Sequence, residues 1–156
     1  MGIAVTLAEY LLNHDVPFDL VPHPHTENAL ASAATSGLPP DRVVKAVVLK
    51  GGDGFTLALL PASRQIRFDQ LRTIAGKYLD IANEEQVEAL FPDCEPGSVP
   101  ALGAAYGLKV IVDDSLADQP ELFLEAGDHA NLIHITGANF KKLIKGDVRG
   151  QFAARY

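Results

Sequence analysis

A lysine interrupts an apolar, strand-like run at Val43–Lys50. Period-two alternation places Lys45 on one face of this strand with Val43, Val47 and Leu49, and the opposite face is also apolar. Removing an ammonium group from water is costly, so a lysine in such a strand needs a partner. Two interpretations are open: Lys45 reaches solvent from an edge strand, or it is a cation at the floor of a pocket for an anionic or carbonyl-bearing ligand. Lys50, beside a turn, is interpreted as ordinary solvated charge.

The second candidate is a loop rich in proline and glycine, residues 94–103. Pro96, Gly97 and Pro100 lie within five positions and restrict the backbone to unusual conformations. Such a loop can direct several N–H groups at one point, as in an oxyanion hole or a carbonyl clamp. Its spacing fits neither glycine-rich nucleotide motif. A tight structural turn is the alternative interpretation.

The third candidate is Gly127-Asp128-His129, which follows a strand-like run. A histidine beside an aspartate can act as an oriented base or as a hydrogen-bond donor. The same tripeptide also makes turns between strands, so both interpretations stay open.

Metal-ligand and nucleophile signals are weak. The histidines that could share a metal site are His23, His25, His129 and His134, and none has zinc-site spacing. Cys94 lies between two acidic residues that raise a thiol pKa and so oppose reactivity. No serine stands in a nucleophile elbow. We therefore expect no metal, no cofactor and no protein nucleophile.

The elements that must position these candidates alternate between helices and strands. Helices are expected over residues 6–14, 27–36, 69–75, 84–91 and 139–144, and strands over 18–21, 43–50, 55–60, 79–82, 108–112, 122–125 and 132–136. The expected helix caps are Thr6, Thr26, Asp69 and Asn83. Gly51–Gly54 marks a hairpin, which excludes a purely parallel sheet. We expect an α+β fold, a single compact domain with a mixed, strongly curved sheet flanked by helices.

Composition limits the classes of protein to which this chain can belong. The chain has 156 residues, of which 47% are hydrophobic, and this fits one globular domain and excludes disorder. No apolar run approaches the roughly 20 residues of a membrane span. The first residues lack the basic region of a signal peptide, and the single cysteine fits a reducing compartment. We expect a cytoplasmic protein with no membrane partner, and the sequence does not define an oligomeric state.

The formal net charge of −7 is unevenly distributed. Residues 41–77 hold seven bases and three acids, and residues 137–156 hold five bases and one acid. Residues 78–136 hold twelve acids and one base. The two basic segments could form a positive face for nucleic acid if they meet in space. The alternative is that the charged blocks only solvate the surface.

Taken in order, five motifs resemble the YbaK / prolyl-tRNA-synthetase-associated editing domain family. They are His23-Pro24-His25-Thr26, Val44–Lys50, Leu59–Ala62, Pro96–Pro100 and Glu125–His129. The resemblance covers about residues 5–145, so we expect an editing domain over residues 1–145 and a C-terminal tail over residues 146–156. It implies a compact α+β domain with a barrel-like mixed sheet.

The resemblance also implies a reaction. Family members hydrolyse mischarged aminoacyl-tRNA and typically remove small wrong residues such as Ala, Cys or Ser, often from prolyl tRNA. Water attacks the ester, assisted by a ribose hydroxyl of the tRNA, while loop N–H groups stabilise the oxyanion. The implied partner is aminoacyl-tRNA, with transient contact to a prolyl-tRNA synthetase or an elongation factor. The chain would then be a freestanding deacylase that edits in trans.

The resemblance assigns roles residue by residue. Lys45 matches the lysine that holds the phosphate or ribose region of the terminal adenosine, and residues 97–101 match the loop that cradles the aminoacyl carbonyl and side chain. The catalytic candidates are Lys45, Gly97, Ser98 and His129, and the substrate-binding candidates are His25, Thr26, Val99, Pro100, Ala101, Gly127 and Asp128. The candidates for RNA backbone contacts are Arg64, Arg67, Arg72, Lys77, Lys141, Lys142 and Lys145.

One position departs from the family pattern. Ala101 stands where the family usually has a proline, with Pro100 directly before it. This favours an alternative function, a non-catalytic module that keeps the pocket and binds aminoacyl-tRNA or a small metabolite. A third hypothesis is metal-dependent hydrolysis through His23, His25, His129 or Cys94.

Overall fold

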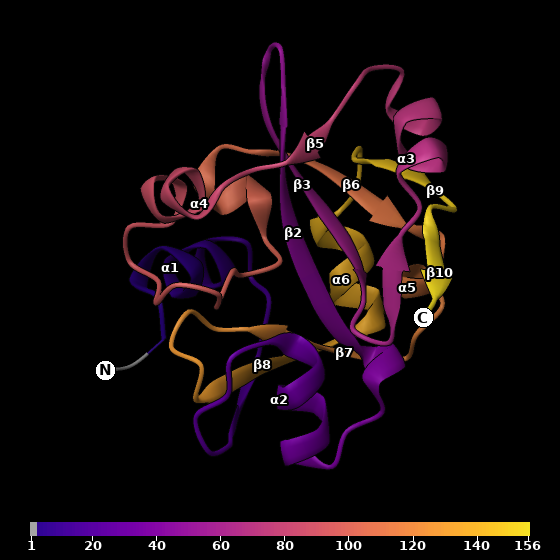
Figure 1. The fold of residues 1–156 in the computed structure, drawn as a ribbon. Coiled ribbons are helices and arrows are strands. Elements are labelled where there is room, and N and C mark those ends of the chain that lie inside the picture. Colours follow the sequence, from indigo (N-terminus) through magenta and orange to yellow (C-terminus); the bar gives the residue numbers. More distant parts are fainter. Residues whose placement is uncertain (1–2) are drawn as a thin grey trace.

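The computed structural model describes residues 3–156 and contains one open, mixed sheet (Figure 1). In spatial order its strands are β1 (Asp19–Pro22), β8 (Asn131–Thr136), β7 (Glu121–Glu125), β2 (Val43–Gly51), β3 (Gly54–Pro61), β6 (Lys109–Asp113) and β9 (Val148–Gly150), with β5 (Asp80–Ile81) paired to the end of β2. The β7–β2, β3–β6 and β6–β9 pairs are parallel and the others antiparallel. The predicted mixed sheet is confirmed, but the barrel is not closed, because β1 and β9 do not pair.

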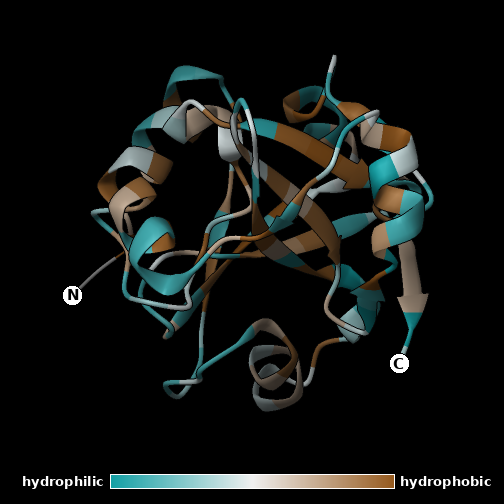
Figure 2. Ribbon diagram, turned by 45° about the horizontal axis from the view of Figure 1, so that its top comes forward, coloured by the Kyte–Doolittle hydropathy of each residue, from teal (hydrophilic) through white to brown (hydrophobic). Residues whose placement is uncertain are grey.

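Helices flank this sheet. They are α1 (Val5–Asn13), α2 (Ala29–Ser36), α3 (Phe68–Ala75), α4 (Glu84–Leu90), α5 (Asp114–Ala117) and α6 (Gly137–Leu143), with 3-10 turns at Pro40–Arg42 and Gly103–Tyr106. In Figure 1, α1 and α4 lie on one side of the central β2–β3 hairpin, and α3 and β9 lie on the other. Figure 2 shows that hydrophobic residues concentrate on the central strands. No helix in the described range is long and apolar enough to cross a membrane.

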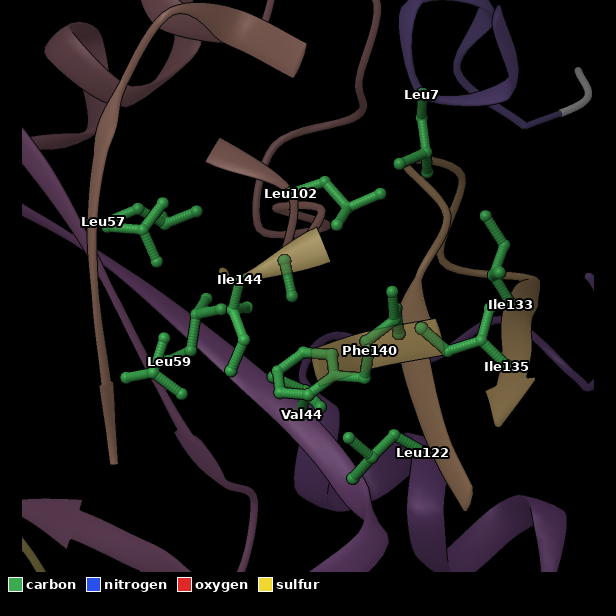
Figure 3. Packing of buried hydrophobic residues seen from close by; sticks show 14 of the residues in the cluster. Leu7, Val44, Leu57, Leu59, Leu102, Leu122, Ile133, Ile135, Phe140 and Ile144 are labelled. Atoms are coloured by element: carbon green, nitrogen blue, oxygen red, sulfur yellow. The ribbon is translucent and has the colours of Figure 1, made fainter. Parts of the chain in front are cut away.

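Strand β3 separates two hydrophobic clusters. Its Leu57 and Leu59 pack with Phe140 and Ile144 in the cluster that also contains α1 (Figure 3). Its Ala58 and Leu60 belong to the cluster that contains Leu71 of α3 and Phe152. This alternation follows from the two-residue period of a strand. The helices α6 and α3 therefore lie on opposite faces of the sheet.

Three of the four predicted helix caps are wrong. α1 begins after Ala4, so Thr6 lies inside the helix, where its N–H donates to Asp93. α2 is capped by Asn28 instead of Thr26, because the Asn28 side chain accepts from Ala31 N–H. α3 begins after Arg67, which places Asp69 in the first turn. Only Asn83 caps as predicted, in a capping box at α4.

Residues 146–156 are part of the folded structure. β9 pairs in parallel with β6, and β10 (Ala153–Arg155) pairs with β4 (Arg64–Ile66) in a separate two-stranded sheet. The three strands are short, which explains why hydrophobic periodicity did not predict them. Through β10, the chain returns to the region of Lys45.

Candidate active site

The sheet splits where β2 leaves β7. These strands pair only at Val43–Phe123 and Val44–Leu124. From Lys45 to Val48, β2 keeps β3 on one side, and no strand within residues 3–156 pairs with its other side until β5. A cavity of about 210 Å³ lies beside this free edge. Its lining comes from the start of α2, from the proline-rich loop, from the end of β7 and from β2 itself: Asn28, Ala29, Lys45, Ala46, Val47, Gly97, Val99 and Glu125.

Lys45 is the cation of this cavity. Its ammonium donates to the backbone carbonyl of Arg64 and to the hydroxyl of Tyr156 at 2.8 Å. The ammonium also lies 5.2 Å from the centre of the Tyr156 ring, within the range of a cation–π contact. β10 and β4 hold both partners in place, because Arg155 pairs with Arg64. An ammonium has three donors, so Lys45 keeps one for a ligand.

The proline-rich loop approaches the cavity with two N–H groups that have no partner within residues 3–156. These are the N–H groups of Gly97 and Val99, whereas Ser98 N–H donates to Glu95 at 3.1 Å. Gly97 has φ of 85°, and a Cβ there would meet the His129 ring at 3.2 Å and the Glu27 carbonyl at 3.3 Å. Only glycine fits this backbone and this contact. The loop therefore contains two N–H donors that no group within residues 3–156 accepts from, and a carbonyl clamp requires such donors.

Ser98 connects the loop to the end of β7. Its hydroxyl accepts from Gly127 N–H at 3.0 Å and from His129 N–H at 3.3 Å, and it lies 3.4 Å from a Glu125 carboxylate oxygen. The side chain is fully buried. These contacts give Ser98 a positioning role for the loop and leave no free group to act on a substrate.

Glu125 was not among the residues selected from the sequence. Glu125 lines the cavity although it is only 3% exposed. One oxygen accepts from Ser32 at 2.9 Å, and Ser32 lies 2.6 Å from the Thr26 hydroxyl. Burial raises the pKa of the Glu125 carboxyl, while the Ser32 hydrogen bond and the charges of His129 and His23 act to lower it. The alternation argument applied to Lys45 would have found this acid, because it shares the buried face of Phe123.

His129 lies behind the loop. It is 2% exposed, has φ of 56°, and its Nε2 donates to the Pro96 carbonyl. Its Nδ1 is buried without a partner within residues 3–156. The ring packs against Gly97 and lies 5.1 Å, centre to centre, from that of His25. The His129 ring therefore packs behind the loop and supports its backbone at Gly97.

The remaining predicted binding residues divide between the cavity and its surroundings. Asp128 accepts from the N–H groups of Ala130 and Asn131, the pattern of a turn between strands. Thr26 is buried behind Ser32. His25 is half-exposed beside the cavity loop, 4.0 Å from Glu95. Val99 lines the cavity, whereas Pro100 is buried.

Ala101 lies away from the cavity. It is 1% exposed and packs in the hydrophobic core with α1. Gly127 has φ of 96°, and a Cβ there would meet Ala4 at 3.0 Å and Cys94 at 3.1 Å. Both residues shape the backbone around the site and do not line the cavity.

The two basic segments meet only in part. Arg64 and Arg72 belong to β4 and α3, Arg67 directly precedes α3, and Arg155 of the second segment pairs with Arg64. Lys141 and Lys142 of the second segment belong to α6, on the opposite face of the sheet from α3. Several of these cations have partners in the protein. Arg72 donates to Leu79 carbonyl and stacks on Phe68 and Tyr78; Lys77 pairs with Asp53; Lys142 donates to the His14 carbonyl. Arg67, Lys141 and Lys145 are exposed.

No cluster of three or more histidine, cysteine, aspartate or glutamate residues within residues 3–156 has the arrangement of a metal site. The predicted direction for Cys94 is confirmed: its pKa is raised to about 11. Burial is the largest cause, and Asp93 adds to it. The Cys94 thiol is therefore protonated at neutral pH.

The chain belongs to the aminoacyl-tRNA editing domain family, whose model matches residues 23–143. Two proline–tRNA ligases contain similar segments. The ligase of Thiobacillus denitrificans is 29% identical over 110 residues, or 69% of this chain, and that of Thermosipho africanus is 37% identical over 51 residues, or 32% of this chain. The matched segments make up 19% and 9% of these ligases, so the chain spans less than a fifth of each.

Solved structures share the fold. One is a protein proposed to be a trans-editing enzyme for prolyl tRNA synthetase. It superposes with a TM-score of 0.83 at 23% identity, over 97% of this chain and 96% of that one. This similarity confirms the mixed α/β domain. The family match identifies this domain as an aminoacyl-tRNA editing domain.

Proposed function

We propose that this domain hydrolyses the ester bond of mischarged aminoacyl-tRNA in trans, and that prolyl tRNA carrying Ala, Cys or Ser is its substrate. The observation that carries the proposal is the cavity itself. Its lining combines Lys45 with Gly97 and Val99, whose N–H groups have no partner within residues 3–156. A phosphate at the end of the tRNA and an ester carbonyl are the groups that such donors bind. The family match and the similarity to two proline–tRNA ligases support this substrate class.

The mechanism follows from these donors. Lys45 binds the phosphate or ribose region of the terminal nucleotide and holds the ester over the loop. The N–H groups of Gly97 and Val99 bind the carbonyl oxygen and stabilise the negative charge that develops on it. A water molecule, assisted by the neighbouring ribose hydroxyl, adds to the carbonyl carbon. The ester C–O bond then breaks, the ribose oxygen takes the proton, and the free amino acid and the tRNA leave.

The apolar part of the cavity lining supports a selection among amino acid side chains. This lining includes Ala29, Val47 and Val99. One methylene in an apolar pocket changes selectivity by roughly 1–3 kcal/mol. We therefore propose that bulky amino acids are excluded by contact with this lining.

A panel of charged tRNAs tests the proposal. Prolyl tRNA carrying Ala, Cys, Ser or Pro, together with Ala and Ser on their own tRNAs, is incubated with the wild type and with Lys45→Ala. We expect the wild type to hydrolyse at least one mischarged species and to leave the cognate ones intact. Lys45→Ala should not hydrolyse any of them faster than buffer does. Saturable binding of charged tRNA without hydrolysis beyond the buffer rate would instead indicate a binding module.

The second function rests on Ala101, which replaces the family proline. Ala101 packs in the core and does not line the cavity. Its side chain is therefore not positioned to alter the loop N–H groups of Gly97 and Val99 directly.

A further inference from the structure

We propose that Glu125 binds the α-ammonium group of the aminoacyl ester, so that the domain selects esters whose amino group is free and charged. This inference rests on the proposed function and adds a specificity determinant to the same site. It assigns a role to a buried acid that the proposed reaction mechanism does not use.

The cavity contains one cation and one anion. Lys45 enters from β2, and Glu125 enters from the end of β7, where the two strands have separated. The end of an aminoacyl-tRNA has the complementary pair, because its phosphate is negative and its α-amino group is positive at neutral pH. With the phosphate at Lys45 and the ester at the loop of Gly97 and Val99, the carboxylate is the remaining charged group of the cavity lining.

The surroundings of Glu125 leave a place for a cation. A carboxylate has about four acceptor positions. The hydroxyl of Ser32 donates to one oxygen at 2.9 Å, and that of Ser98 lies 3.4 Å from the other. Within residues 3–156, no lysine, arginine or histidine forms an ion pair with this carboxylate. A buried charge without a counterion is costly, and an arriving ammonium supplies the missing partner.

The neighbouring elements do not supply that partner. Ser32 from α2 and Ser98 from the loop are neutral. His23 and His129 are the titratable groups whose charges act on Glu125. Each of them has a buried ring nitrogen without a hydrogen-bond partner in the described residues, His23 Nε2 and His129 Nδ1. Both rings are held on their other nitrogen by backbone carbonyls, of Pro24 and Pro96. Neither ring forms a hydrogen bond with the Glu125 carboxylate within the described residues.

The test compares two esters that differ only in the charged group. Prolyl tRNA is charged with alanine, and part of it is converted to the lactyl ester, in which a hydroxyl replaces the ammonium. Each enzymatic kcat/KM is divided by the rate of spontaneous hydrolysis in the same buffer, because the ammonium also activates the ester chemically. We expect the wild type to prefer the alanyl ester at least tenfold, as is typical when a buried charge pair loses one member.

Glu125→Gln separates recognition from folding. The variant keeps the size of the side chain and removes its charge. We expect it to lose at least tenfold in kcat/KM on the alanyl ester and to leave the lactyl ester almost unchanged, so that the preference collapses. Glu95→Gln is the matched control, since it removes a charge from the same loop region outside the cavity lining, and it should keep the preference.

Three outcomes would overturn the inference: equal hydrolysis of both esters by the wild type, equal loss on both esters in Glu125→Gln, or loss of the preference in Glu95→Gln. Absence of any hydrolysis by the wild type would instead reject the proposed function. If Glu125→Gln fails to fold, calorimetry on the wild type decides. Non-hydrolysable amide analogues of alanyl and lactyl adenosine 5′-phosphate should bind with at least tenfold different Kd, and equal affinity would contradict the role of Glu125.

Discussion

The cavity lining holds two opposite charges in different environments. Lys45 is half-buried, and its two partners come from β4 and from Tyr156, next to β10. Glu125 is almost fully buried, and its hydrogen-bond partners are hydroxyl groups. The cation keeps contact with solvent, whereas the anion is screened from it.

This difference indicates an order of events. A partly exposed ammonium can attract a phosphate from solution over several ångströms. A buried carboxylate acts only over short distances, on a ligand that has already displaced water from the cavity. Capture would therefore depend on Lys45, and discrimination on Glu125. The following predictions test this division, from the largest expected effect to the smallest.

Replacing Lys45 should have the largest effect. We expect Lys45→Ala to lose about 100-fold or more in kcat/KM, because a charge-assisted contact to a phosphate disappears together with the positioning that it provides. Lys50→Ala is the matched control, because Lys50 lies on the same strand and is exposed. Its activity should stay within about twofold of the wild type. Full hydrolysis by Lys45→Ala would reject the role of this residue.

A change in the backbone of the loop should have the second largest effect on activity. Gly97→Ala places a methyl group against the His129 ring at φ of 85°. Such strain costs about 1–3 kcal/mol and moves the N–H groups of the loop. We expect about a tenfold loss in kcat with a smaller change in KM. Gly52→Ala, where an added Cβ meets nothing within 4 Å, should behave like the wild type in both kinetics and thermal unfolding.

The burial of Glu125 should make the difference in free energy of unfolding between the wild type and Glu125→Gln depend on pH. Its pKa is raised on folding, so the folded protein binds this proton more tightly than the unfolded chain does. The cost of the buried charge is therefore absent below the ordinary value of 4.5 and develops as the pH rises through the raised pKa. We expect Glu125→Gln to be more stable than the wild type at pH 7.

Urea unfolding of both proteins at pH 7 and at pH 4.5 measures this difference. The advantage of Glu125→Gln should shrink at the lower pH. An advantage that grows as the pH falls would show that the carboxylate is stabilised in the fold, contrary to its burial. The comparison also separates stability from activity, because the same variant is expected to hydrolyse the alanyl ester more slowly.

The smallest effect should follow removal of the Tyr156 hydroxyl. Tyr156→Phe keeps the ring near Lys45 and deletes one hydrogen bond, which contributes about 0.5–1.5 kcal/mol. We expect a two- to threefold decrease in kcat/KM, measured with the same alanyl substrate. Tyr78→Phe, which changes an exposed tyrosine elsewhere, is the control. A loss as large as that of Lys45→Ala would mean that the hydroxyl contacts the substrate itself.

Strand periodicity located residues of the site, whereas capping signals mostly failed to locate the helix ends. Alternation placed Lys45 on the correct face of β2, with Val47 and Leu49, and the same rule identifies Glu125 once it is applied to β7. Two capping motifs failed where other contacts use the same residues: the Thr26 hydroxyl contacts Ser32, and the backbone N–H of Thr6 donates to Asp93, 87 positions away. Local patterns do not include such distant partners.

The charge pattern illustrates a second limit of the sequence. Two basic segments suggested one nucleic-acid surface, but only the end of the second segment, with Arg155 on β10, reaches the first, while its helix α6 lies on the opposite face of the sheet from α3. The sequence also did not predict that Tyr156 contacts Lys45, because this contact depends on the pairing of β10 with β4. Contacts between segments that are distant in the chain depend on topology, which composition and periodicity do not define.

The contact between Lys45 and Tyr156 also has a consequence for folding kinetics. It joins residues 111 positions apart, whereas the β2–β3 hairpin closes over a few residues. Closing a long loop costs more entropy, and non-local pairings tend to form late. The central hairpin can therefore form early, while the environment of Lys45 is completed only after β10 has docked. During refolding, secondary structure should return before hydrolytic activity does.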